Sequence, residues 1–398
     1  MRRRTFLASS TAGAAAWLAG CAARVRATDT PNAVPNAAAP DGALVFVGTY
    51  TANTRSQGVY RFRADARTGA WTPLGATDVG PDPSFLAVHP NGRVLYVVNE
   101  TERFAGQASG AVRAFAIDRR TGDLTPLGDP VATGGGAPCY VSVDATGRLL
   151  LVANYVGGSV AAFPLAADGR PGARTFLDQH VGGGPRADRQ ERPHAHCVVP
   201  DPSNRWAAAA DLGIDLVSVY ALDARAGTLT PAHTAAVRPG AGPRHLAFHP
   251  SGRTLYAVGE LDLTLITLAF DPATGALGAA ESVPLLPTPP AAPTPPGSTA
   301  ADLHVHPSGR VLYASVRGDD SLVRFALDGA GRPTFAERVP AGGERPRNFG
   351  LDPAGRFLYA AHQGSDAVVA FRVAPGDGRL TPAGLRVDVP APVCVRFA

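Results

Sequence analysis

The stretch Pro243–Glu260 reads PRHLAFHPSGRTLYAVGE, and its pattern decides the fold. A short apolar run, a Pro-Ser-Gly-Arg turn and a second apolar run follow one another, which is typical of a β-hairpin. Proline fixes the backbone at the start of the turn, and glycine accepts conformations that tight turns require. Because the pattern recurs along the chain, one hairpin unit organises the whole sequence.

Five further copies of this unit indicate a repeat architecture. They are Pro83–Glu100, Pro138–Tyr155, Pro193–Leu212, Ala300–Arg317 and Pro346–Gln363. In Pro193–Leu212 we place two extra residues in the turn. A third strand is expected after each hairpin, at Gly58–Phe62, Ala111–Ile117, Ser159–Leu165, Leu216–Leu222, Leu263–Phe270, Ser321–Leu327 and Ala367–Val373. A turn and a fourth, shorter strand follow most of them, so the units predict a β-propeller.

The two ends of the repeat array each contain half a hairpin. Leu44–Thr49 matches a second strand without a first, and Pro392–Phe397 matches a first strand without a second. Pairing of these strands completes a unit and removes an open sheet edge. We therefore expect an all-β, seven-bladed β-propeller over residues 43–398, closed by the C-terminal strand against the N-terminal blade. An open solenoid does not explain the split unit.

Residues 1–20 match an export signal. Arg3-Arg4-Thr5-Phe6-Leu7 fits the twin-arginine pattern, and a small-residue apolar run follows it. Leu18-Ala19-Gly20-Cys21 matches the lipobox of bacterial lipoproteins, so we expect lipidation of Cys21; an ordinary signal peptide with an incidental cysteine is the alternative. Residues 21–42, rich in Ala, Pro, Asn and Thr, predict a flexible tether. We expect an exported, lipid-anchored protein on the periplasmic side, which meets the membrane only through this N-terminus.

The composition narrows the chemistry. All 37 basic residues are arginine, which excludes Schiff-base chemistry and a P-loop lysine. Residues 1–20 carry three Arg and no acid, so the net charge of the rest is +4 − 3 = +1, and no nucleic-acid partner is expected. Cys139, Cys197 and Cys394 lack metal-ligand spacing. Without G-x-S-x-G, H-E-x-x-H or G-x-G-x-x-G, we expect neither a metal nor a cofactor.

Comparison of the repeats separates framework positions from candidate site positions. The Gly-Arg of the turn recurs and is therefore structural. His89, His249 and His306 each precede that turn, which argues against a metal site at His304 and His306. The position after the leading proline varies instead, as Ser84, Cys139, His194, Arg244, Ala301, Arg347 and Val393. The last position of the second strand also varies, as Thr49, Glu100, Tyr155, Leu212, Glu260, Arg317 and Gln363.

These two variable series must meet on one face of the propeller. The start of one hairpin strand lies beside the end of its partner, so both series surround the mouth of the central channel. Ionisable groups gathered in a concave site are a binding-site signal; rim charges paired as salt bridges are the alternative. We expect Glu100 and Arg347 to contact substrate, with His245 and Asp302 flanking the site. His196 is placed in register with Leu246, as a core or supporting residue.

At these residues the chain resembles the seven-bladed propeller lactonase family, of the 6-phosphogluconolactonase and carboxymuconate-lactonising enzyme type. The motifs that carry the resemblance are Gly242–Pro250, Pro193–His196, Ala300–Arg310 and Arg345–Phe349, and it covers nearly all of residues 43–398. It implies a site of one His, two Arg and one Glu, carried here by His194, Arg244, Glu260 and Arg317. The export signal and the proline-rich loop Pro284–Pro296, expected to be semi-rigid, depart from the cytoplasmic 6-phosphogluconolactonase pattern.

The sequence therefore predicts an exported, monomeric lactonase. His194 or Glu260 would activate water, and Arg244 and Arg317 would stabilise the oxyanion and any substrate anion. The expected partner is a lactone or anionic sugar derivative, 6-phosphogluconolactone-like or gluconolactone-like. A non-catalytic ligand- or protein-binding propeller and a muconate-type cycloisomerase are the alternatives.

Overall fold

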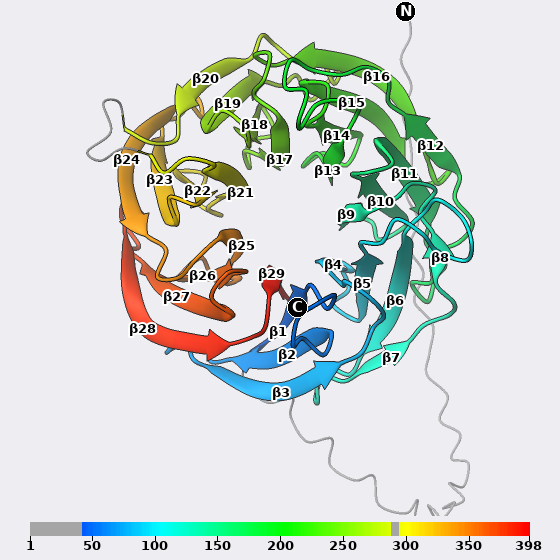
Figure 1. Ribbon diagram of the computed structural model, residues 1–398, viewed down its shortest axis with the longest axis horizontal. Helices are drawn as coiled ribbons and strands as arrows, with labels where there is room; N and C mark the ends of the chain where they lie inside the picture. The colour runs from blue at the N-terminus through cyan, green and yellow to red at the C-terminus, as the bar shows by residue number, and fades with distance from the viewer. Residues whose placement is uncertain (1–41, 288–293) are drawn as a thin grey trace, which may run out of the picture. The chain divides into compact units, whose positions relative to one another are not determined.

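The computed structural model describes residues 42–287 and 294–398. The predicted signal, the tether up to residue 41 and Cys21 lie outside the described residues, as do residues 288–293 of the proline-rich loop. In the described parts of the chain, seven antiparallel sheets are arranged as blades around a central axis (Figure 1). The predicted seven-bladed propeller is confirmed. No helix in these parts is long and apolar enough to cross a membrane.

Each blade begins with a strand beside the axis and ends with one at the rim (Figure 1). The blades, from the axis outward, are: β29 (Pro392–Phe397), β1 (Ala43–Thr49), β2 (Val59–Ala64), β3 (Trp71–Thr77); β4 (Phe85–Val88), β5 (Val94–Asn99), β6 (Ala111–Ile117), β7 (Leu124–Pro126); β9 (Pro138–Val143), β10 (Leu149–Asn154), β11 (Ser159–Pro164), β12 (Phe176–Gln179). They continue with β13 (Ala195–Pro200), β14 (Trp206–Asp211), β15 (Leu216–Asp223), β16 (Thr228–Ala236); β17 (Pro243–Phe248), β18 (Thr254–Gly259), β19 (Thr264–Ala269), β20 (Glu281–Pro284). The last two are β21 (Thr299–Val305), β22 (Val311–Arg317), β23 (Ser321–Leu327), β24 (Pro333–Pro340); β25 (Pro346–Leu351), β26 (Phe357–His362), β27 (Ala367–Val373), β28 (Leu380–Asp388). The short β8 (Val131–Ala132) also pairs with β6.

The first blade is closed as the split terminal unit predicts. Strand β29 pairs antiparallel with β1, and Val47 stands opposite Val395. Both residues belong to one buried cluster that also contains Phe62 and Tyr359. The C-terminal strand thus completes both the hydrogen-bond ladder and the core of the N-terminal blade, which leaves β1 without an open edge.

The repeated turn residues join neighbouring blades. The ring of His89 lies 3.0 Å from the carbonyl oxygen of Gly147, and His306 lies 2.9 Å from that of Gly355. Gly147 has a φ of 70°, and a Cβ there would lie 2.3 Å from the His89 ring. Only glycine fits both the backbone and the space. His306 therefore serves the framework, as its recurrence predicts.

The repeat alignment at Pro193–Leu212 is wrong by two residues. The amide of Asp201 donates to the carbonyl of Trp206, just as His249 donates to Thr254, so this turn has the ordinary length. Ala195 pairs with Asp211 as Pro243 pairs with Gly259. His196, rather than His194, is consequently the register equivalent of Arg244. The additional residues belong to the loop before the strand.

Candidate active site

Most innermost hairpins, though not the one formed by β4 and β5, share a β-bulge at the start of their first strand. The register shifts after Pro243 in β17, after Ala300 in β21, after Pro346 in β25 and after Ala195 in β13. A bulge places an extra residue on one strand and redirects its side chains. The residues that the bulges contain are His196, Arg244, His245, Ala301, Asp302 and Arg347. One repeated backbone feature thus supplies the polar groups around the axis.

A polar pocket of about 370 Å³ opens on this face. Its lining combines the ends of inner strands with two loops, and consists of Glu100, Tyr155, Arg189, His196, Glu260, Gly297, Thr299, Arg317, Arg345 and Arg347. Four guanidinium groups face two carboxyl groups, a formal balance of +4 − 2 = +2. The predicted residues Glu100, Glu260, Arg317 and Arg347 all line this one pocket. Its charge suits an anionic substrate, intermediate or product.

Glu260 is held by three arginines. Its Oε1 lies 2.7 Å from Nη2 of Arg189, and its Oε2 lies 2.9 Å from Nε of Arg244 and 3.2 Å from Nη2 of Arg317. Burial would raise the pKa of Glu260, but the charges of Arg317, Arg244 and Arg189 outweigh burial and lower that pKa to about 2. The carboxylate is therefore ionised near neutral pH and too weakly basic to accept a proton readily there.

Glu100 has the opposite electrostatic setting. Its Oε2 accepts a hydrogen bond of 2.9 Å from the hydroxyl of Tyr50, which in turn accepts one of 2.9 Å from Nη2 of Arg347. The Arg347 guanidinium also lies 5.4 Å from the centre of the Tyr50 ring. Burial raises the pKa of Glu100 above its usual 4.5, and Arg347 only partly opposes this rise. Glu100 is thus the carboxyl group of the pocket best suited to exchange a proton.

The two histidines of Pro193–His196 have different surroundings. The ring of His194 stacks on that of Tyr155 at 4.4 Å, and its Nδ1 and Nε2 face the Tyr155 carbonyl and Glu191. His194 does not line the pocket, whereas His196 does. Burial lowers the pKa of His196 well below 6.5, so its ring is neutral. The histidine that the structure brings to the predicted site is therefore His196.

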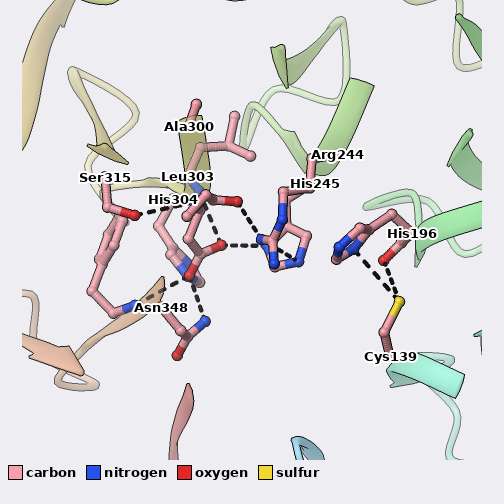
Figure 2. Close-up of polar contacts among 12 residues, drawn as sticks. Cys139, His196, Arg244, His245, Ala300, Leu303, His304, Ser315 and Asn348 are labelled. Carbon is pink, nitrogen blue, oxygen red and sulfur yellow. Dashed lines mark hydrogen bonds and ion pairs between the residues drawn. The ribbon is translucent and has the colours of Figure 1, made fainter. Parts of the chain in front are cut away.

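Arg244, His245 and Asp302 lie beneath the pocket rather than in its lining. All three are almost fully buried, with exposures of 2%, 3% and 2%. Figure 2 shows His245 beside Arg244, with His304 and Asn348 on one side and His196 and Cys139 on the other. Arg244 reaches the site through Glu260. His245 and Asp302, expected to flank the site, have no surface in the pocket.

Sequence reasoning missed Arg189, Tyr50 and Arg345. Arg189 comes from the loop between β12 and β13, which no other repeat shares. The sequence signal for this loop is the extra length near Pro193–Leu212, which the repeat alignment places in the turn. Tyr50 follows the last residue of β1 and therefore stands one place beyond the series that was compared. Arg345 stands one place before β25, with a φ of 55°.

The described parts of the proline-rich loop lie next to this site. Leu285 and Leu286 are buried in the core between neighbouring blades, and Gly297 and Thr299 line the pocket. The loop thus begins against the core and ends at the pocket, while residues 288–293 are outside the described chain.

Comparison with known proteins gives a consistent result. The family described as "Lactonase, 7-bladed beta-propeller" matches residues 44–397. The 6-phosphogluconolactonase of Bacillus subtilis is 36% identical over 354 residues, which cover 88% of this chain and 97% of that protein. The solved periplasmic gluconolactonase of Pseudomonas aeruginosa is 33% identical with a TM-score of 0.80, over 89% of this chain and 99% of that one. The chain belongs to the seven-bladed β-propeller lactonase family.

Proposed function

We propose that this protein hydrolyses a sugar lactone in the pocket between Glu100 and Glu260. The observation that carries the proposal is the presence, in one pocket, of Glu260, held by three guanidinium groups, and Glu100, bonded to the hydroxyl of Tyr50; these surroundings displace the two pKa values in opposite directions. Such a pair separates the group that moves a proton from the group that stays charged. The similarity to proteins named 6-phosphogluconolactonase and gluconolactonase supports the choice of a lactone.

Glu100 is the proposed general base. Its carboxylate takes a proton from water as the water oxygen attacks the lactone carbonyl carbon, and the carbonyl becomes a tetrahedral oxyanion. Collapse of this intermediate breaks the ring C–O bond, and the proton on Glu100 passes to the departing ring oxygen. The product is an open-chain hydroxy acid, which ionises to a carboxylate. Tyr50 and Arg347 hold Glu100 in place.

Arg317 is the proposed oxyanion partner. It lines the pocket and is buried to 7% exposure, so its charge acts where water screens it weakly. Glu260 fixes Arg317 and Arg189 at the pocket and Arg244 beneath it, and it remains ionised throughout the reaction. This assignment gives Glu260 an electrostatic role and moves the base from His194 or Glu260, which the sequence favoured, to Glu100.

A phosphorylated lactone is the second candidate substrate, and Arg345 favours it. Arg345 lines the pocket, and in the described chain its side chain has no hydrogen bond or ion pair. A guanidinium without a partner suits a phosphate oxygen. The twin-arginine pattern and the periplasmic relative favour a lactone without phosphate. We propose that the protein is exported and lipidated at Cys21, and that it meets such a lactone on the periplasmic side.

A lactone panel tests the proposal. Glucono-δ-lactone, its 6-phosphate and a muconolactone are incubated with the full chain and with Arg317→Ala, and acid release is followed at constant pH. We expect hydrolysis of a sugar lactone well above the spontaneous rate and a rate at least about 100-fold lower for the variant. Absence of hydrolysis of every lactone would favour a binding propeller, and activity on the muconolactone alone would favour the cycloisomerase alternative.

A further inference from the structure

A buried hydrogen-bonded chain runs beneath the pocket, from the closing strand to Arg244. We propose that Asp302 and His245 are positioning residues, which fix the Arg244 guanidinium against Glu260 by holding His245 in one tautomer (Figure 2). The inference rests on the proposed lactonase function for its kinetic consequence. The arrangement itself is a property of the folded protein without substrate.

Asp302 must be ionised, because its carboxylate receives donors on both oxygens. Oδ1 accepts from the Leu303 amide at 2.9 Å, and Oδ2 accepts from Nδ2 of Asn348 at 2.5 Å and from the Phe349 amide at 3.2 Å. Backbone amides cannot act as acceptors. Burial would raise the pKa of Asp302, but His304 and His245 outweigh it and hold that pKa well below 3.8.

The tautomer of His245 follows from its two neighbours. Nδ1 lies 2.6 Å from Oδ1 of Asp302, an acceptor, so Nδ1 carries the proton. Nε2 lies 3.1 Å from Nη1 of Arg244, and a guanidinium can only donate, so Nε2 must be the unprotonated acceptor. Burial, followed by the charge of Arg244, lowers the pKa of His245 to about 3, which keeps the ring neutral. Both neighbours demand the same tautomer.

The consequence for Arg244 is a single orientation. Nη1 donates to His245 and also to the carbonyl of Ala301, and with Nη1 fixed in this way Nε lies 2.9 Å from Oε2 of Glu260 in an ion pair that contains no Nε hydrogen bond. If the proton of His245 moved to Nε2, two N–H groups would oppose each other and the guanidinium would have to turn. A displaced Arg244 would shift Glu260 and, through it, Arg317. The tautomer of a residue outside the pocket thereby controls the geometry of the charges within it.

The chain extends to the closure of the propeller. Asn348 donates to Asp302 through Nδ2 and accepts the Val395 amide at 2.8 Å through Oδ1, so its amide has one orientation. Val395 lies in β29, the strand that completes the first blade. The network thus passes from β29 through β25 and β21 to β17, along the innermost strands of four blades. Correct closure is therefore a condition for the orientation of Arg244.

Nitrogen NMR of histidine-labelled full-length protein tests the tautomer directly. The resonances of His245, assigned by their loss in His245→Gln, should show a neutral ring protonated at Nδ1 between about pH 5 and 8, where an ordinary histidine titrates. A ring protonated at Nε2, or one that becomes charged in this range, would overturn the proposal. This measurement needs no substrate, so it decides the arrangement even if lactone hydrolysis fails.

Kinetics of three variants test the positioning role. His245→Leu removes the acceptor and should lower kcat at least about tenfold with little change in KM. His245→Gln offers a carbonyl oxygen to Arg244 and should retain kcat within about threefold of the wild type. Asp302→Asn should turn its amide nitrogen toward His245, because the Oδ2 position faces more fixed donors than the Oδ1 position does. The NMR spectrum of this variant should then show His245 protonated at Nε2, and its kcat should be lost together with that change.

His249→Gln is the matched control, since His249 follows the same strand but bonds to the turn carbonyl of Gly309. Its kcat should stay within about twofold of the wild type. Equal kcat values for His245→Leu and the wild type would overturn the proposal. So would equal losses in His245→Leu and His245→Gln, because packing alone would then account for the effect. If His245→Leu does not fold, the kcat of His245→Gln and the NMR spectrum of the wild type still test the proposal.

Discussion

Arg244 and Glu260 stand at the two ends of one hairpin, and their side chains meet in a buried ion pair of 2.9 Å between Nε and Oε2. Two more guanidinium groups, from a loop and from the next blade, contact the same carboxylate. Glu260 is therefore the common counter-charge of three cations. Its ionisation is a condition for the whole arrangement.

Glu260→Gln should destabilise the fold as well as lower activity. Removal of one partner from a buried ion pair leaves uncompensated charge, which costs about 3–5 kcal/mol in the free energy of unfolding. Urea denaturation measures this loss. Glu281→Gln, at an exposed position of β20, is the control and should change stability by less than about 0.5 kcal/mol. A Glu260→Gln protein as stable as the control would contradict the account.

The stability of the protein should fall at acid pH because of the same residue. The pKa of Glu260 is about 2 in the folded protein and near 4.5 in the unfolded chain, so the unfolded state binds the proton more readily. The stabilisation is fully present above 4.5 and is lost as the pH falls toward 2. Denaturation of the wild type and of Glu260→Gln across this range should show that the difference between their free energies of unfolding becomes smaller at acid pH. A difference that does not change with pH would contradict the assignment of this pH dependence to Glu260.

The pH dependence of activity should follow Glu100 instead. Glu100 must be unprotonated to take a proton from water, and burial raises its pKa above 4.5. The kcat should therefore rise with pH through an ionisation whose pKa lies above 4.5. Tyr50 and Arg347, the neighbours of Glu100, stay in one protonation state over this range. Removal of the Arg347 charge in Arg347→Gln should move this ionisation to still higher pH. An acid limb at or below 4.5 would rule out Glu100 as the base.

The framework can be tested apart from the site. Gly147→Ala forces a non-glycine residue to a φ of 70° and places a Cβ 2.3 Å from the His89 ring, so it should cost about 1–3 kcal/mol of stability. Gly329→Ala, where no atom lies within 4 Å and φ is not positive, is the matched control. Thermal unfolding measures both. The folded Gly147→Ala protein should keep the wild-type kcat, because the turns lie away from the pocket.

Arg345 should decide between the two substrates. If the substrate carries phosphate, Arg345→Gln should raise KM for the 6-phosphate about 10- to 100-fold and leave glucono-δ-lactone unaffected, since a charge-assisted contact contributes about 1.5–3 kcal/mol. If the substrate is the neutral lactone, both KM values should stay within about threefold. Equal large rises for both lactones would exclude a phosphate-specific role.

Much of the fold could be predicted from the sequence, since every blade repeats one hairpin and the ends divide one unit between them. The position of the site at the strand ends followed from the same comparison. The roles of individual residues did not. A bulge at the start of β17 turns Arg244 and His245 away from simple alternation, and nothing in the apolar pattern marks a bulge.

The histidine that lines the pocket, His196, differs from the predicted His194 for a related reason. Pro193 resembles the leading proline of other units, so His194 was aligned with Arg244, yet the strand starts at Ala195. Turn length decides register, and the turn Asp201–Arg205 has the ordinary length despite its different residues. Arg189 could not be identified from the sequence, because its loop has no counterpart in the other repeats with which it could be compared. Displaced pKa values depend on burial, which the sequence does not contain.

The rate of hydrolysis of a sugar lactone by Glu100→Gln, beside the wild type, tests the central claim most directly. Both proteins are assayed at one pH by the uptake of base, with the spontaneous rate subtracted, and their folding is checked by thermal unfolding. Glutamine cannot take a proton, so we expect a folded variant with kcat about 10²- to 10⁴-fold lower. A folded Glu100→Gln protein with the wild-type kcat would contradict the proposed mechanism.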